Sequence, residues 1–288
     1  MQPREKTQST GSPIAATSPS TQVIAWTGET PNVNVIAYPS LQSETLKPQS
    51  SYAPSLAVSP SNNLLYLAWT NKSSPSYVNY ATSSDGKSYS PSTQITYLAS
   101  SAAPSLTVFN NAVYVAWRGS DGTLNIMPIS GTTPSQPAWT GADAPALGTL
   151  NNSVLYVGWR DSKDNLWYMT STDGINFTTP VELKQTSPHA PAFVEFNGFL
   201  YIAWTGNGDN HLNVMRIVDT KPVTLGETSS CAPTLSVAGG LLYIGWVGSD
   251  PNNVLNVLSS TDAIHFGSKA EIQETTNAGL SMVAFAGN

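Results

Sequence analysis

The pentapeptide VYVAW (residues 113–117) decides the fold, because versions of it recur along the whole chain. The copies are LYLAW at 65–69, LYVGW at 155–159, LYIAW at 200–204, LYIGW at 242–246 and a shorter VIAW at 23–26. Each is a short run of aliphatic and aromatic residues, as is typical of a β-strand. The final tryptophans are 42 to 48 residues apart, a period that suits four short strands and their turns. That is one blade of a β-propeller.

An Ala-Pro dipeptide opens each complete repeat and predicts the innermost strand of each blade, since proline at the first residue of a strand loses no ladder hydrogen bond. The N-terminal repeat lacks this strand, whereas Met282–Gly287 at the other end of the chain aligns with Phe193–Gly198 of an inner strand. We therefore predict an all-β, six-bladed β-propeller with four antiparallel strands per blade. It is closed by pairing of the C-terminal strand with the N-terminal blade, which removes free sheet edges.

The repeats also predict the domain organisation. Residues 1–20 form a flexible N-terminal arm, and residues 21–288 form a single propeller domain. Blade 1 is split between 21–51 and 279–288. The other blades cover 53–101, 103–142, 144–188, 190–230 and 232–277.

Composition excludes several classes of function. The net charge is −6 and only 12 of the 288 residues are Lys or Arg, so a phosphate-binding surface for nucleic acid is not expected. No apolar run approaches the roughly 18 residues that would span a bilayer. The first twenty residues contain no secretory h-region, and the compartment stays open. Cys231 is the only cysteine, so no intramolecular disulfide forms, and no cofactor is predicted.

Three repeats carry a similar polar turn after their third strand: SSDGKSY at 83–89, STDGINF at 171–177 and STDAIHF at 260–266. The carboxylate can accept backbone N–H bonds within such a turn, and glycine supplies a positive φ. The pattern resembles the Asp-box of sialidase-like propellers, although these copies have one residue fewer before the aromatic and the last has Ala263 in place of glycine.

The resemblance implies a structural role for the turns and a propeller fold over most of the chain. The family's sialidases use three arginines, a Tyr–Glu pair and an acidic Asp. In the propeller this chain has only Arg118, Arg160 and Arg216, and it has no Arg-Ile-Pro start and no evident Tyr–Glu pair. Sialidase activity is therefore not expected.

The loops after the Trp strands collect Asp, Asn, Gly and Arg beside an aromatic residue. Such a mixture suits carbohydrate, because aromatic faces cover C–H patches and polar side chains bind hydroxyls. Turn formation is the alternative explanation for the same residues. The candidate ligand-binding residues are Arg118, Asp121, Arg160, Asp164, Asp209, Asn210 and Asp250, with Tyr52, Trp139 and Trp167 as aromatic contacts.

A second pattern concerns the residue just before each Ala-Pro, which is expected at the mouth of the central channel. These residues are Tyr52, Ala102, Asp143, His189, Cys231 and Ala278. Asp143, His189 and Cys231 come from consecutive blades and can supply a Cys–His nucleophile pair or a three-ligand metal site. Unrelated drift at a tolerant loop position is the alternative explanation, and it is the one that the sequence favours. Glu195 is an unusual acid on an inner strand, which makes Asp143, His189 and Glu195 the candidate catalytic residues.

A repeated asparagine occupies one position of the third strand, at Asn34, Asn79, Asn125, Asn213 and Asn256, with Trp167 in its place in the fourth blade. Because asparagine is depleted in strands, we expect its carboxamide to bridge backbone groups between blades.

The leading functional hypothesis is a non-catalytic, lectin-like protein that binds glycans or another small ligand on the face formed by these loops. The alternatives are a sialidase-like glycoside hydrolase or lyase with one axial site, and a protein-interaction scaffold.

Overall fold

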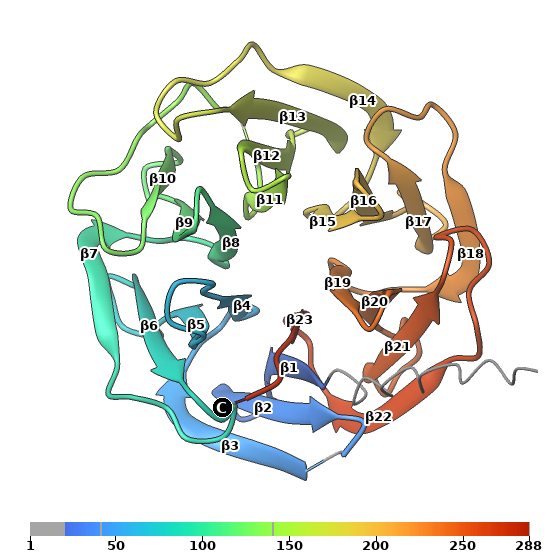
Figure 1. Ribbon diagram of the computed structural model, residues 1–288, viewed down its shortest axis with the longest axis horizontal. Helices are drawn as coiled ribbons and strands as arrows, with labels where there is room; N and C mark the ends of the chain where they lie inside the picture. Colours follow the sequence, from blue (N-terminus) through green and yellow to red (C-terminus); the bar gives the residue numbers. More distant parts are fainter. Residues whose placement is uncertain (1–20, 41, 140, 288) are drawn as a thin grey trace, which may run out of the picture.

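The computed structural model describes residues 21–40, 42–139 and 141–287, and over these it confirms the predicted all-β, six-bladed propeller. Figure 1 shows the six antiparallel sheets arranged around a central axis. Residues 1–20, the predicted arm, lie outside the described part of the chain. No helix among the described residues is long and apolar enough to cross a membrane.

The strands form four concentric layers, to which five blades contribute four strands each and blade 3 contributes three. The innermost strands, a, are β23 (Leu280–Ala284), β4 (Ser55–Val58), β8 (Ser105–Phe109), β11 (Ala146–Leu150), β15 (Ala192–Phe196) and β19 (Thr234–Ala238). The b strands are β1 (Gln22–Thr27), β5 (Leu65–Thr70), β9 (Ala112–Arg118), β12 (Val154–Arg160), β16 (Phe199–Thr205) and β20 (Leu241–Val247).

The c strands are β2 (Asn32–Tyr38), β6 (Tyr77–Ser83), β10 (Leu124–Pro128), β13 (Asn165–Ser171), β17 (His211–Arg216) and β21 (Val254–Ser260). The outer d strands are β3 (Gln42–Gln49), β7 (Thr93–Ala99), β14 (Val181–Thr186), β18 (Val223–Thr228) and β22 (Ala270–Thr275). In blade 3 the described residues form no d strand, and a single bridge between Ile126 and Ser135 takes its place.

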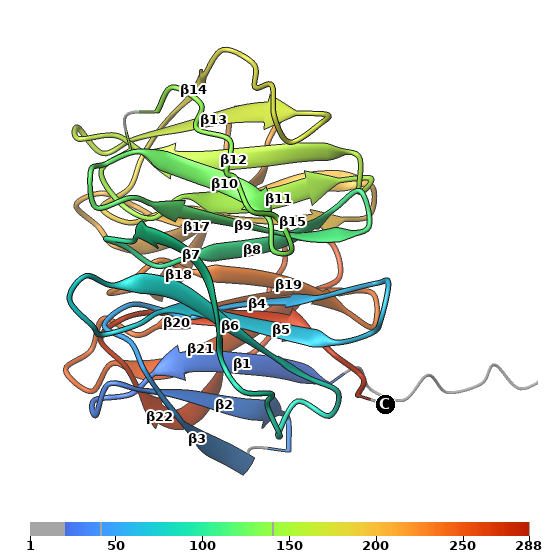
Figure 2. The same cartoon turned by 90° about the vertical axis from the view of Figure 1, so that its left-hand side faces the viewer.

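The ring is closed by the last strand. β23 pairs antiparallel with β1, with Ile24 opposite Met282 and Trp26 opposite Leu280. Blade 1 is therefore assembled from both ends of the described chain, as the sequence predicts. Figure 2 shows the ring from the side, with β1 and β2 of this blade above β3.

The inner strands are also connected to one another by side chains. Ser281, Ser55 and Ser105 each accept a hydrogen bond at Oγ from a backbone N–H in the inner strand of the next blade, at 2.9–3.0 Å. Thr234 makes the corresponding contact to Met282 at 3.3 Å. The residue after Ala-Pro thus provides hydrogen bonds that the curved inner layer cannot obtain from strand pairing.

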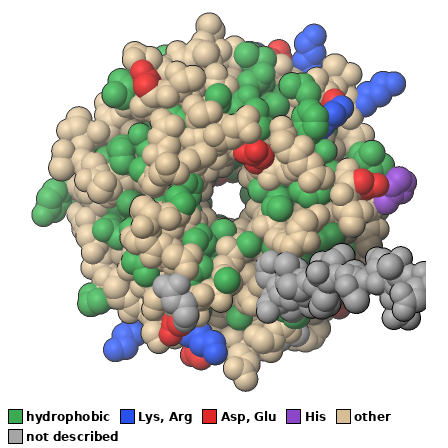
Figure 3. All heavy atoms as spheres, viewed as in Figure 1, with side chains coloured by type: hydrophobic (Ala, Val, Ile, Leu, Met, Phe, Trp, Pro, Cys, Tyr) green, Lys and Arg blue, Asp and Glu red, His purple; other side chains and the backbone are tan. Residues whose placement is uncertain are grey.

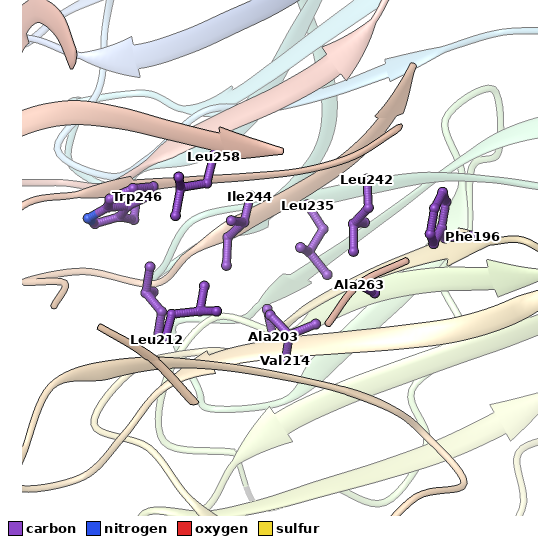
Figure 4. Packing of buried hydrophobic residues seen from close by; sticks show 11 residues of the cluster. Phe196, Ala203, Leu212, Val214, Leu235, Leu242, Ile244, Trp246, Leu258 and Ala263 are labelled. Atoms are coloured by element: carbon purple, nitrogen blue, oxygen red, sulfur yellow. The ribbon is translucent and has the colours of Figure 1, made fainter. Parts of the chain in front are cut away.

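Six hydrophobic clusters fill the six interfaces between neighbouring blades. The Trp of each b strand packs against the preceding blade, and all six are at most 2% exposed. Figure 4 shows one interface, in which Trp246, Ile244 and Leu258 of blade 6 face Leu212 and Val214 of blade 5. The near-continuous apolar character of the b strands follows from this burial on both faces.

The Ser-x-Asp turns occur in alternate blades, 2, 4 and 6, and have the same geometry in each. In blade 2 the Asp85 carboxylate accepts the N–H groups of Lys87 and Ser88 at 2.8 and 2.7 Å, and Ser83 Oγ accepts the N–H of Gly86. The aromatic residue that follows, Tyr89, packs into the interface with the preceding blade. Phe177 and Phe266 do the same in blades 4 and 6.

The repeated asparagine does not bridge blades, so that prediction is wrong. Each carboxamide instead donates to the carbonyl two residues earlier in its own strand, for example Asn34 Nδ2 to Asn32 O at 3.0 Å. In the four-stranded blades, the pairing of c and d strands shifts register at or next to this position. The carbonyls that accept the carboxamides also accept a backbone N–H from the b–c loop, for example that of Gly28 at Asn32 O, so the carboxamide is a second donor that ties the loop to the start of the c strand.

We expect deletion of Leu280–Asn288 to abolish cooperative folding. The deletion removes the buried Leu280, Met282 and Phe285 and one strand of blade 1. Losing several buried apolar side chains costs on the order of 10 kcal/mol, comparable to the whole stability of a domain. Thermal unfolding followed by circular dichroism checks this, with deletion of 286–288 as the control. A cooperative transition at the native temperature in the longer deletion would refute ring closure.

A second prediction concerns acid stability. The N–H groups of Ser88 and Lys87 lower the pKa of Asp85 to about 2. The N–H of Asn176 lowers that of Asp173, and the His265 side chain and N–H lower that of Asp262. Such carboxylates stabilise the fold above their unfolded pKa of about 4, and this contribution is lost as the pH falls towards 2.

The triple variant D85N/D173N/D262N should therefore be less stable than the wild type at pH 6 and depend less on pH between 4 and 2. Urea midpoints at pH 6, 4, 3 and 2 measure both effects. Glu44→Gln, at an exposed carboxylate outside the turns, is the control. An unchanged pH slope in the triple variant would show that these turns do not couple protons to folding.

Candidate functional site

The b–c loops and the d–a connections lie on one face of the ring, here called the loop face. The a–b hairpins and the c–d turns lie on the opposite face. Backbone contacts tie the two kinds of loop together, because Ser50 bridges to Asn71, Ser100 to Gly119 and Ser229 to Gly248. Every ligand-binding candidate from a b–c loop therefore lies on the loop face.

The residues before Ala-Pro surround the mouth of the axial channel on this face. A depression of about 280 Å³ is lined by Tyr52, Asp143, His189, Cys231 and Ala278. Figure 3 shows the channel as an opening through the ring. The sequence prediction that these positions share the mouth is consistent with this lining.

A serine two residues earlier holds several mouth residues in place. Ser187 Oγ donates to the carbonyl of His189 at 2.8 Å and accepts its N–H at 3.1 Å. Ser50 makes the same pair of contacts with Tyr52, and Ser229 makes them with Cys231. The backbone N–H and C=O groups of the mouth residues thus find hydrogen-bond partners in the serine side chain. The side chains of the mouth residues are not needed for this and can differ from blade to blade.

The charged groups of the mouth gather beside blades 4 and 5. Arg160 Nη1 donates to Asp164 Oδ1 at 2.8 Å, and its Nε lies 3.6 Å from Asp143 Oδ2. Asn207 of blade 5 donates to the second oxygen of Asp164 at 3.2 Å. The structure thus brings Asp143, Arg160 and Asp164 into one network.

His189 lies at the edge of this network. Burial lowers the pKa of its imidazole, Asp143 opposes that effect and Arg160 adds to it. A neutral imidazole has one donor and one acceptor nitrogen. At neutral pH the side chain can therefore give and receive a hydrogen bond at the mouth.

Cys231 lines the same depression but is 9% exposed. Burial raises the pKa of its thiol, so the nucleophilic thiolate is disfavoured. Its Sγ lies 3.9 Å from Ser230 Oγ. Among the described residues Asp143, His189 and Cys231 do not form a cluster able to hold a metal ion.

Glu195 lies at the other end of the channel. It lines the far mouth on β15, and its Oε2 accepts the N–H of Asn151 in the a–b hairpin of blade 4 at 2.7 Å. Since a strand rises about 3.3 Å per residue, the six residue steps from His189 to Glu195 separate the two by roughly 20 Å. The three catalytic candidates are therefore not brought together.

Several acids of the b–c loops are engaged in their own turns. Asp121 Oδ1 accepts the N–H and the hydroxyl of Thr123, which lowers its pKa. Asp209 and Asp250 each accept a backbone N–H two residues on, at 3.0 and 2.8 Å. Asn210 is exposed at a positive φ of 57°. Arg118 donates to Ser101 and to the carbonyl of Gly141, which lies near the end of the same blade.

Trp139 and Trp167 are both partly buried against the cluster between blades 3 and 4. The indole N–H of Trp167 donates to Asp161 at 3.0 Å. Their rings contribute to filling this interface, which reduces the surface left for stacking with a ligand.

Sequence reasoning missed one large cavity. A groove of about 810 Å³ lies between blades 1 and 2, away from the channel, and is lined by Leu46, Trp69, Asn79, Ala81 and Tyr89 among others. The available signal was Ala81. The equivalent third-strand residues in the other blades are large: Ile36, Met127, Met169, Met215 and Leu258.

Comparison with known proteins supports the architecture. No protein-family model and no curated protein matches the sequence. Among solved structures, the BP39L lectin from Burkholderia pseudomallei superposes with a TM-score of 0.63 at 14% identity, over 88% of this chain and 81% of the lectin. A chain of a nidogen–laminin complex gives a TM-score of 0.61 at 15% identity, over 91% and 97% of the two chains. At such identities the similarity shows the fold alone.

Proposed function

We propose that the protein is a carbohydrate-binding, non-catalytic recognition propeller with a glycan site on the loop face. The observation that carries the proposal is the depression at the channel mouth. Tyr52, Asp143 and His189 converge there between small alanine side chains, and Arg160 and Asp164 lie alongside. The mouth therefore combines an aromatic ring, an anionic acceptor and a neutral imidazole around an open space.

Sugar hydroxyls both donate and accept hydrogen bonds, so a site needs both kinds of partner. Asp143 offers carboxylate oxygens and His189 offers one donor and one acceptor, while Tyr52 has an aromatic face for C–H groups. Alanines at 53, 103, 144, 190 and 232 leave room for a ring to approach. The lectin with the same fold adds support, because a six-bladed ring of this kind serves carbohydrate recognition in that protein.

The hydrolase alternative has less support. Glycoside hydrolysis generally uses two carboxyl groups that flank the scissile bond, one of them protonated. At this mouth Asp143 and Asp164 are both paired with Arg160, and Glu195 lies at the far mouth. We extend the proposal to the turns of blades 2, 4 and 6, as Asp-boxes of the sialidase-like class with a structural role only.

A protein-interaction role has one specific observation in its favour. Ile175, Ile264 and Val218 protrude from the c–d turns with exposed fractions of 69, 57 and 74%. They lie on the face opposite the proposed glycan site. Protein binding there would be compatible with carbohydrate binding on the loop face.

We predict that Tyr52→Ala and His189→Ala each weaken glycan binding by about tenfold, equivalent to about 1.4 kcal/mol. A glycan array identifies the ligand, and isothermal titration with that glycan measures the change. His265→Ala, an 85% exposed histidine on the opposite face, is the matched control and should bind as the wild type does.

Absence of any glycan binding by the wild type would refute the function. Turnover of nitrophenyl glycosides that depends on Asp143 would instead favour the hydrolase alternative.

A further inference from the structure

The groove between blades 1 and 2 has a volume of about 810 Å³. One wall is β3 of blade 1, from Thr45 to Gln49. The other is the face of blade 2 that carries Trp69, Asn79 and Ala81, continued by Tyr89–Ser92 of the c–d connection. Its volume lies within the range of about 300–1,000 Å³ that is usual for small-ligand pockets.

The cavity exists because one side chain is small. In every blade the residue two after the repeated Asn position, on the same face of the c strand, points into the interface with the preceding blade. Blade 2 has Ala81 there, whereas the five other blades have isoleucine, methionine or leucine. The missing atoms leave space above Trp69 that the neighbouring blade does not fill.

The two equivalent interfaces show how the space is otherwise closed. Between blades 3 and 4, Met169 takes the place of Ala81, and Trp167 that of Asn79, with Trp139 packed beside it. Between blades 5 and 6, Leu258 fills the position and is 6% exposed. The groove is therefore specific to one of three related interfaces.

Asn79 supplies the second observation. The residue is 9% exposed, and its Nδ2 donates to Tyr77 O at 3.0 Å. Its Oδ1 has no hydrogen-bond partner among the described residues. In blades 1, 3 and 5 the same oxygen accepts a side-chain donor, from Thr45, Gln136 and Thr224 respectively. In blade 6 the oxygen of Asn256 also lacks a donor among the described residues, but it is buried and faces no such groove.

In blade 2 the residue opposite Asn79 is Gln94, which donates instead to the carbonyl of Thr96 at 3.0 Å. Asn79 Oδ1 is not one of the buried side-chain atoms that lack a partner, so it is open to the groove, where water or a ligand can complete its hydrogen bonding. Asn79 lines the groove, so a ligand hydroxyl can reach this oxygen.

The lining as a whole favours an uncharged, hydroxylated ligand. It combines the aromatic residues Trp69 and Tyr89 with the amides of Gln49, Asn71 and Asn79, and it contains no carboxylate. Lys47 is its only charged residue and is exposed at the rim. Aromatic surface beside amide groups matches a sugar ring, which has one C–H face and a rim of hydroxyls.

We propose that this groove is a saccharide-binding site that takes one neutral sugar ring, with the ring against the partly exposed Tyr89 and a hydroxyl donating to Asn79 Oδ1. The inference rests on the proposed carbohydrate-binding function and assigns to it a site separate from the channel mouth. Two sites on one chain would also allow multivalent attachment to a branched or clustered glycan.

Ala81→Met is the decisive variant, because it installs the side chain that blades 3, 4 and 5 carry at this position. It should fill the groove, preserve or raise the melting temperature, and weaken binding of the glycan identified on the array at least about tenfold. Asn79→Ala should also weaken binding, since it removes the acceptor while leaving the space open. Leu258→Met, at the equivalent position of blade 6, is the matched control and should leave binding unchanged.

Titration calorimetry of the three variants and the wild type, with the array glycan as probe, distinguishes the outcomes. Wild-type affinity in a folded Ala81→Met variant would overturn the groove site while leaving the proposed function intact. Absence of glycan binding by the wild type would overturn the proposed function and this inference with it. Loss of binding in Ala81→Met and Asn79→Ala with a native Leu258→Met supports the site.

Discussion

The structure depends on closing a ring of inner strands that cannot pair with one another through their backbones. Each inner strand pairs on one side with the b strand of its own blade, and its other edge faces the axis. Ser55, Ser105, Thr234 and Ser281 provide acceptors for N–H groups of the next blade, and β23 closes the circuit against β1. Ala-Pro precedes Ser55, Ser105 and Thr234, whereas Gly279-Leu280 precedes Ser281. The loops at either end can therefore differ widely in sequence without altering the ring.

The six blades are not equivalent, and their differences follow an alternating order. Blades 2, 4 and 6 end their c strands in Ser-x-Asp turns whose aromatic residue packs on the preceding blade. At the intervening interfaces tyrosines take that place, with Tyr66 stacked on Tyr80 and Tyr156 on Tyr168. Pairs of blades thus form the larger unit, repeated three times. The groove between blades 1 and 2 has no counterpart at the two related interfaces. It is therefore a feature of this one interface and not of the fold in general.

The fold could be predicted from sequence because its signals are periodic. Three independent signals predict the same ring. They are the Trp strands at regular spacing, the Ala-Pro dipeptides that open the repeats, and a C-terminal sequence that resembles an inner strand.

The mouth residues could be located for the same reason, since Tyr52, Asp143 and His189 occupy equivalent positions in the repeat. Their contacts could not be predicted, because the pairing of Arg160 with Asp143 and Asp164 depends on loop conformation. The role of the repeated asparagine was misjudged because its partner is a backbone carbonyl two residues earlier, and a contact with the backbone leaves no pattern in the residue types. The groove was missed because a cavity is defined by an absent side chain, and Ala81 is an unremarkable strand residue until its neighbours across the interface are known.

The groove also bears on whether stability alone explains the sequence. The side chains around an unfilled space of this kind lose van der Waals contacts. Large-to-small replacements in protein cores lower the free energy of unfolding by about 2–5 kcal/mol. The Asn79 amide oxygen beside it has no donor among the described residues and depends on water or a ligand for its hydrogen bonds. The chain has a solution to each problem elsewhere, since Met169 and Leu258 fill the related interfaces and Thr45 satisfies the corresponding oxygen in blade 1. Blade 2 uses neither solution, and it lines the space with amides and Tyr89. It therefore departs from the best local packing, as a binding site would require.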